Sequence, residues 1–273
     1  MAISNFIPTI WSENLISSLN NNYIAVANCN RDYEGEIKQR GSSVKICDIG
    51  NISIGDYTKD SDMSLPQELS DSLRELTIDQ AKYFNFQVDD IDKTQCSPKL
   101  LEVAMRNAAN ALANAADRYV LSLGLNASYQ ITASLPDENI IDVILKCREL
   151  LYGHNVMNSD DVVIEISPQV ATYLIKTQLD TFSYNNDIIS TGCIGTIAGC
   201  KVFVTNNLNI ENGNTYHCLM RSKRAIAFAE QLSEIEAYRP EKRFADAIKG
   251  LHLYGAKVIY PDEVIDLCVT INE

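Results

Sequence analysis

The chain has 273 residues, of which 46 % are apolar and 22 % are charged, so it is a globular sequence with ample material for a core. Its net charge of −13 argues against broad binding to a nucleic-acid backbone, which requires clustered lysine and arginine. The eight cysteines include no C-x-x-C pair, and no run approaches the roughly 20 apolar residues of a membrane span. We expect a soluble protein without a secretory signal, made in a reducing cytosol.

The chain opens with one short amphipathic segment, residues 8–19. Ile10, Trp11, Leu15 and Leu19 can share one helical face there. A short terminal helix with few neighbours in sequence must dock on another surface, either its own domain or another subunit.

Two β-rich stretches follow, at 41–54 and 76–88, separated by mostly polar and acidic residues. The second stretch alternates, with these apolar residues on one face: Leu76, Ile78, Phe84, Phe86 and Val88. The connection is far longer than a tight turn, so we predict a two-stranded ribbon with an elaborate tip. Because such a ribbon is marginally stable alone, its apolar face packs either on its own sheet or across a neighbouring subunit.

Residues 97–124 predict one long helix around which the other elements are organised. Ser97 is a preferred N-cap, Pro98 suits the first helical position, and Gly124 lies where a C′ glycine ends a helix. Its apolar residues recur at helical spacing: Leu101, Ala104, Met105, Ala108, Leu112, Ala115, Ala116, Tyr119 and Leu123. At 1.5 Å per residue the helix is about 40 Å long.

The remaining sequence predicts mixed α/β structure. The expected elements are helices at 136–152 and 167–179, strands at 161–166 and 201–205, and short strands at 216–220 and 224–229. After a turn at 260–262, apolar and polar residues alternate from Ile265 to Ile271. We expect this last strand to return to the sheet beneath the long helix.

Chemistry-bearing residues form no recognisable catalytic motif. The three histidines, His154, His217 and His252, are far apart and form no metal-ligand pair of the H-E-x-x-H kind. His217 is next to Cys218, but neighbours on a strand point to opposite faces, so this pair cannot act as base and nucleophile. We therefore predict no enzyme activity, no cofactor and no metal.

Several short strings occur in a characteristic order. Tyr33-Glu34-Gly35-Glu36-Ile37 is followed by GSSVKI, ICDIGNISIGDYT, the strand through Phe84 and Phe86, and the long helix. Near the end, RAIAFAEQLSEIEAYRPEKRFADAIKGLHLYGAKVIYPDEVI carries Tyr254-Gly255-Ala256-Lys257-Val258 and Pro261. Together these strings resemble the major capsid (coat) proteins of tailed bacteriophages.

The resemblance implies an α+β fold, the one shared by tailed-phage and herpesvirus shells. The implied divisions are an N-terminal arm (1–36), an extended loop (37–92), a peripheral domain with the spine helix (93–130), an α/β axial domain (131–240) and the closing strands of the peripheral domain (241–273). Some relatives begin with a long scaffolding segment, whereas this chain leads almost directly into the arm. A separate scaffolding protein, or none, is therefore expected.

The resemblance also implies a structural subunit that assembles into an icosahedral head shell around phage DNA. Its partners would be copies of itself in pentamers and, if the shell is large enough, hexamers, together with a separate scaffolding protein, a portal, and DNA bound on the inner face without sequence specificity, with no membrane. It would belong to the virion capsid and assemble in the host cytoplasm. The predicted subunit-interface residues are Trp11, Ile46, Ile52, Ile54, Tyr57, Ile78, Phe84 and Phe86. The alternatives are a shell subunit of a cellular nanocompartment and, in a different class, a cytosolic thiol hydrolase.

Overall fold

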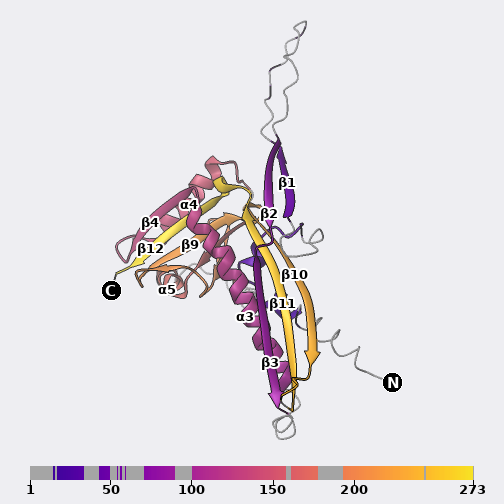
Figure 1. Cartoon of the computed structure of the whole chain (residues 1–273). Helices are drawn as coiled ribbons and strands as arrows, with labels where there is room; N and C mark the ends of the chain where they lie inside the picture. Colours follow the sequence, from indigo (N-terminus) through magenta and orange to yellow (C-terminus); the bar gives the residue numbers. More distant parts are fainter. Residues whose placement is uncertain are drawn as a thin grey trace.

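A long helix packed along a three-stranded sheet forms the spine of the molecule (Figure 1). Helix α3 spans Leu100–Ser122 and continues as the 3₁₀ helix η4, Leu123–Asn126. The computed structural model describes residues 15, 17–33, 43–49, 54, 56, 59, 71–89, 100–157, 161–177, 193–242 and 244–272. Within these residues the predicted spine helix is confirmed, and the predicted Ser97 cap and Pro98 lie outside them.

The buried side of α3 consists mainly of alanine and leucine, which lets the sheet approach closely. Its buried apolar residues are Met105, Ala109, Leu112, Ala113, Ala116, Val120 and Leu121. The role predicted for Gly124 is wrong: it lies inside η4 instead of ending the helix as a C′ residue. A Cβ atom there would lie 2.5 Å from Leu219 Cδ1, so this glycine permits close approach to the next sheet.

The sheet beside α3 has the antiparallel order β10-β11-β3. Its strands are β10 (Ile226–Tyr238), β11 (Ala245–Val258) and β3 (Gln80–Asp89). Phe84 and Phe86 on β3 pack against the main core, and their rings stack with centroids 6.0 Å apart. A Cβ atom on Gly250, the register partner of Phe84 on β11, would collide with the Phe84 ring, so the glycine makes room for that ring.

The second sheet is mixed, with the order β4-β12-β9-β5-β7-β6 and β8 paired to β9. Its strands are β4 (Tyr129–Leu135), β5 (Val162–Ile166), β6 (Cys193–Ile197), β7 (Cys200–Val204), β8 (Ile210–Glu211), β9 (Thr215–Ser222) and β12 (Val264–Ile271). Helices α4 (Ile140–Gly153) and α5 (Pro168–Thr177) join the same hydrophobic core as the spine. Short 3₁₀ helices lie at η2 (Val26–Asn28), η7 (Lys223–Ala225) and η8 (Pro261–Glu263).

Strand β12 corrects one prediction. Its alternation from Ile265 to Ile271 does form a strand, but the strand pairs with β4 in parallel and with β9 antiparallel. It therefore lies inside the mixed sheet and not in the sheet beside α3. The alternation predicts a strand but does not indicate which strands it pairs with, because pairing is decided by the partners on both sides.

The predicted ribbon is also corrected. Strand β1 (Ser43–Ile49) pairs antiparallel with β2 (Asp71–Thr77), from Ser43 with Thr77 to Ile49 with Asp71. The return strand ends there, and after Ile78 and Asp79 the chain enters β3, which pairs with β11. Phe84 and Phe86 consequently belong to the body of the molecule, while the β1–β2 hairpin projects beyond the end of the long sheet (Figure 1).

Among the described residues, no helix is both long and apolar enough to cross a membrane.

Candidate assembly surfaces

The base of the β1–β2 hairpin rests on the end of the long sheet. Its inward side chains form a second hydrophobic cluster, separate from the main core, with residues of β10 and β11 and a residue that follows β11. The members of this hairpin cluster are Val44, Ile46, Leu76, Ile78, Ala227, Ala229, Leu253 and Ile259. The direction in which the hairpin leaves the body is thus fixed by a small apolar contact.

Gly255 on β11 makes that contact possible. A Cβ atom at this position would collide with the Thr77 carbonyl oxygen and would lie 3.0 Å from the Thr77 carbonyl carbon and 3.1 Å from Ile78 Cα. These are backbone atoms and cannot rotate away as a side chain can. Gly255 belongs to the string that carries the family resemblance, and the structure gives it a physical role as the seat of the hairpin base.

The predicted interface residues have different surroundings. Ile46 and Ile78 are buried in the hairpin cluster, so their side chains are covered before any neighbour arrives. Phe84 and Phe86 are half-buried against the core of their own chain. Ile54 is 96 % exposed and is the one described member of the set that is free to meet a neighbour. Trp11, Ile52 and Tyr57 lie outside the described residues.

The N-terminal segment is held on the spine by a carboxylate that the sequence pattern did not single out. Asp117, which is 1 % exposed on α3, accepts hydrogen bonds from the backbone nitrogens of Ile24, Ala25 and Val26 at 3.0–3.1 Å. Burial raises the pKa of this carboxyl, and the three backbone donors act in the opposite direction. In the sequence, Asp117 lies on the polar face of the predicted helix and looks like an exposed acidic residue. Only its contacts with residues 24–26 in the folded structure reveal its role.

A buried arginine joins the same segment to the mixed sheet. Arg221 on β9 is fully buried and donates to the carbonyl oxygens of Asn28 at 2.7 Å and Ala25 at 2.8 Å. It also donates to Glu165 Oε1 on β5 at 2.8 Å, and that carboxylate is fully buried as well. Each charge therefore compensates for the loss of hydration of the other, since neither has solvent nearby.

Glu230 on β10 ties the N-terminal segment to the long sheet. Its carboxylate accepts from Arg31 at 2.6 Å and from the Tyr23 hydroxyl, and it lies 2.8 Å from His252 Nε2. Burial alone would raise the pKa of Glu230, but the hydrogen bonds of His252 and Tyr23 and the charge of Arg31 hold it below its ordinary value.

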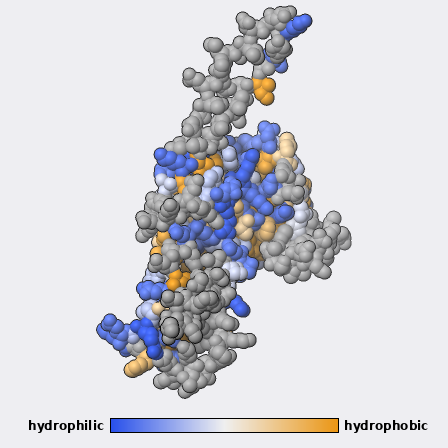
Figure 2. Space-filling view, turned by 90° about the vertical axis from the view of Figure 1, so that its right-hand side faces the viewer, coloured by the Kyte–Doolittle hydropathy of each residue, from blue (hydrophilic) through white to orange (hydrophobic). Residues whose placement is uncertain are grey.

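The outer surface carries scattered apolar residues in polar surroundings. On the outer face of the long sheet Tyr83 is 78 % exposed and is the register partner of Leu251. Close by, Lys249 pairs with Glu236 at 2.7 Å. Figure 2 shows a mainly hydrophilic described face with apolar residues in small separate areas. The described part of this face therefore presents no single large apolar patch.

A thiol enzyme requires a cysteine and a histidine that converge. Cys218 is fully buried, and burial raises the pKa of its thiol to about 12. His217 instead lies 3.4 Å from Cys268 Sγ on the neighbouring strand, a pair that sequence reasoning missed because the two residues are 51 positions apart. Burial and the charge of Asp266 raise the pKa of Cys268 to about 12, so its thiol is protonated at neutral pH. A protonated thiol is a poor nucleophile.

The sequence matches no protein-family model and no curated protein. The structure, in contrast, matches solved structures over most of its length. A chain from Mycobacterium phage Che8 superposes with a TM-score of 0.70 and 28 % identity, covering 90 % of both chains. A chain of the capsid structure of cyanophage P-SCSP1u superposes with a TM-score of 0.65 and 14 % identity, covering 86 % of this chain and 85 % of the other. The fold is that of the tailed-phage major capsid proteins.

The same capsid fold occurs in a virus-like particle from Pyrococcus furiosus. That chain superposes with a TM-score of 0.61 and 12 % identity, covering 96 % of this chain and 99 % of the other. The expected α+β capsid fold is thereby confirmed for this chain.

Proposed function

We propose that the protein is the major capsid subunit of a tailed phage and assembles into the icosahedral head shell that encloses genomic DNA. The observation that carries this proposal is the match to the Che8 chain over 90 % of both chains at 28 % identity. A match of this extent includes the whole subunit architecture and not one shared domain.

The proposed mechanism is assembly through many modest contacts. Subunits form pentamers and hexamers through heterologous contacts that close by rotation. The part of the extended loop (37–92) beyond the hairpin base lies over neighbouring subunits, and exposed Ile54 is the described loop residue that fits this role. The described part of the arm (1–36) packs on its own chain, where Leu15, Leu19 and Val26 join the main core. Because the hairpin base is seated on β10 and β11 of its own chain, each subunit presents its loop in a fixed direction.

We propose that the subunit has the divisions that the family resemblance implies. By residue range the peripheral domain contains the spine (93–130) and closing strands (241–273), and the axial domain spans 131–240, but one strand from each range pairs in the other part. Sheet pairing supports a more interlaced arrangement, since β10 joins the sheet beside α3 and β12 joins the mixed sheet. The two parts therefore share one chain that crosses between them more than once.

The proposed partners are further copies of the chain, a separate scaffolding protein, a portal, and DNA held without sequence specificity. Assembly takes place in the host cytoplasm, and the product is the virion capsid. A net charge of −13 supports an inner surface that does not grip DNA tightly. The proposed subunit is not an enzyme.

Substitution at Ile54 tests this function. Ile54→Ser removes an apolar side chain that is 96 % exposed, so we expect unchanged subunit stability and fewer closed shells in electron micrographs. The matched control is Ile175→Ser on α5, which is 45 % exposed and is expected to assemble normally. Wild-type protein that stays monomeric at every concentration, with or without a scaffolding protein, would contradict the proposal.

A second candidate is the shell subunit of a cellular nanocompartment, which the coverage of the Pyrococcus furiosus particle chain favours. The contents of particles isolated from the native host separate the two. Nuclease-protected DNA supports the phage capsid, whereas a co-purifying protein cargo in place of DNA supports the nanocompartment.

A further inference from the structure

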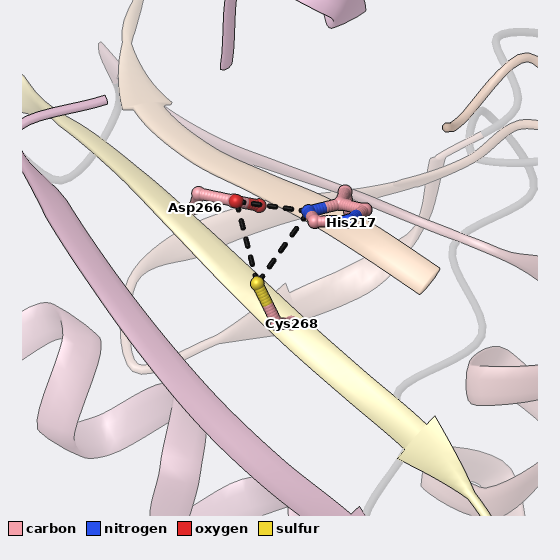
Figure 3. Close-up of side chains that lie close together, drawn as sticks. All are labelled: His217, Asp266 and Cys268. Carbon is pink, nitrogen blue, oxygen red and sulfur yellow. Dashed lines mark hydrogen bonds and ion pairs between the residues drawn. The ribbon is translucent and has the colours of Figure 1, made fainter. Parts of the chain in front are cut away.

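Three potential metal ligands converge on one face of the mixed sheet, outside every contact described for assembly (Figure 3). Asp266 and Cys268 are two residues apart on β12, so their side chains point to the same face. His217 on β9 is the register partner of Cys268 and points to that face from the neighbouring strand. The antiparallel pairing of β9 and β12 thus assembles the group.

The three donor atoms form a nearly regular triangle. His217 Nδ1 lies 2.9 Å from Asp266 Oδ2 and 3.4 Å from Cys268 Sγ, and Cys268 Sγ lies 3.3 Å from Asp266 Oδ2. A tetrahedral zinc ion with bonds of 2.0–2.3 Å holds its ligand atoms about 3.3–3.8 Å apart. The triangle therefore needs adjustments of only a few tenths of an ångström to coordinate such an ion.

We propose that His217, Asp266 and Cys268 form a binding site for a divalent ion of the zinc class, with the fourth position open to water. The donor set selects the metal: a thiolate and an imidazole favour zinc-like ions, while magnesium and calcium require oxygen ligands. Binding through Cys268 displaces the thiol proton to solvent as the sulfur–metal bond forms.

The surroundings of His217 fit a ligand role. Its other ring nitrogen, Nε2, lies 3.6 Å from Glu211 Oε2 on β8. Metal-bound histidines usually direct the second ring nitrogen at a carboxylate, a backbone carbonyl or water, which fixes the ring orientation and the tautomer. Glu211 is thus a positioning residue for the ring, and a bound metal would replace the contact that Nδ1 now makes with Asp266 Oδ2.

Accessibility also fits a site that exchanges metal with solvent. Asp266 is 1 % exposed and anchors the inner end of the site, while the side chain of His217 is 14 % exposed and Cys268 is half-buried. An ion here would cross-link the last strand, β12, to β9, which are joined otherwise by backbone pairing and packing. The expected effect is a more stable mixed sheet in each subunit.

Cobalt(II), used as a spectroscopic substitute for zinc, tests the proposal on the full chain after chelator treatment. We expect one equivalent to produce the near-ultraviolet thiolate-to-cobalt band and the visible bands of tetrahedral cobalt, and zinc to abolish both. Cys268→Ser should lose the thiolate band, and Glu211→Gln should weaken binding about 10–100-fold.

Two control variants separate this site from other ligands. Cys29→Ser keeps a donor for the Ala25 carbonyl, to which Cys29 Sγ donates at 3.3 Å, and His154→Gln alters an exposed histidine. Both should bind cobalt as the wild type does. A thiolate band that is absent in the wild type, or that persists unchanged in Cys268→Ser, would overturn the proposal.

A second readout does not depend on spectra. Zinc should raise the unfolding temperature of the wild type and of the two controls, but not that of Cys268→Ser or His217→Gln. If zinc stabilises all variants equally, the triangle is a hydrogen-bonded contact only and the proposal fails.

Discussion

The mixed sheet and the β1–β2 hairpin are stabilised in different ways. All five residues of β5 are buried, and helices α4 and α5 share one continuous core with the strands. The hairpin instead contacts the body through the small hairpin cluster and through the close approach of its backbone to Gly255. A subunit can therefore retain its folded body while the direction of its loop depends on a few atoms, which makes that junction the sensitive point for assembly.

The largest effect is expected in the body. Arg221→Met leaves the fully buried Glu165 carboxylate without its partner, which costs about 3–5 kcal/mol of unfolding free energy. The double variant Arg221→Met/Glu165→Leu removes both charges and should recover much of that loss. Urea unfolding of the three proteins measures the difference. A double variant as unstable as the single one would show that the backbone contacts of Arg221 to Ala25 and Asn28 dominate instead.

At the junction, Gly255→Ala should cost about 3 kcal/mol, because the added methyl group collides with the Thr77 backbone. The control is Gly153→Ala at the end of α4, where nothing lies within 4 Å of the added atom, and which should be neutral or slightly stabilising. Denaturant unfolding measures stability, and electron microscopy measures shell closure. Equal stability of the two variants would mean that the hairpin base shifts freely to accommodate the methyl group. It would contradict the conclusion that a close backbone contact at Gly255 holds the hairpin on the body.

A smaller and pH-dependent effect is expected where the N-terminal segment meets the long sheet. The folded state holds the pKa of Glu230 below its ordinary value of 4.5, so this carboxylate stabilises the fold above that pH and the contribution is lost as pH falls through the lowered pKa. Glu230→Gln should cost about 2 kcal/mol at pH 7, and the difference from wild type should shrink under acid conditions. Unfolding curves at neutral and acid pH measure it. A difference that stays constant with pH would contradict the assigned role.

How much of the fold the sequence predicts depends on how local each signal is. The helical spacing of Met105, Leu112 and Ala116 is contained in a few turns, so α3 was predictable with close bounds. The alternation that marks β12 is equally local. The division between β2 and β3 at Ile78 was not predictable, because one alternating run continues through both strands and only the competing partners β1 and β11 divide it.

The candidate sites follow the same rule. Composition and the absence of catalytic motifs pointed away from an enzyme, and the order of short strings pointed to a capsid subunit. Neither indicated that Asp117 receives the N-terminal segment or that Ile46 and Ile78 are covered by their own chain. Those facts depend on contacts between residues far apart in sequence.

By itself the sequence determined the spine helix, most of the strands and the family resemblance, since each rests on neighbouring residues. The tertiary structure alone decided the seat of the hairpin on Gly255 and the meeting of His217 with Cys268. The physical reason is strand register: a shift of one residue between β9 and β12 would turn His217 to the opposite face from Cys268, and no local pattern encodes that register.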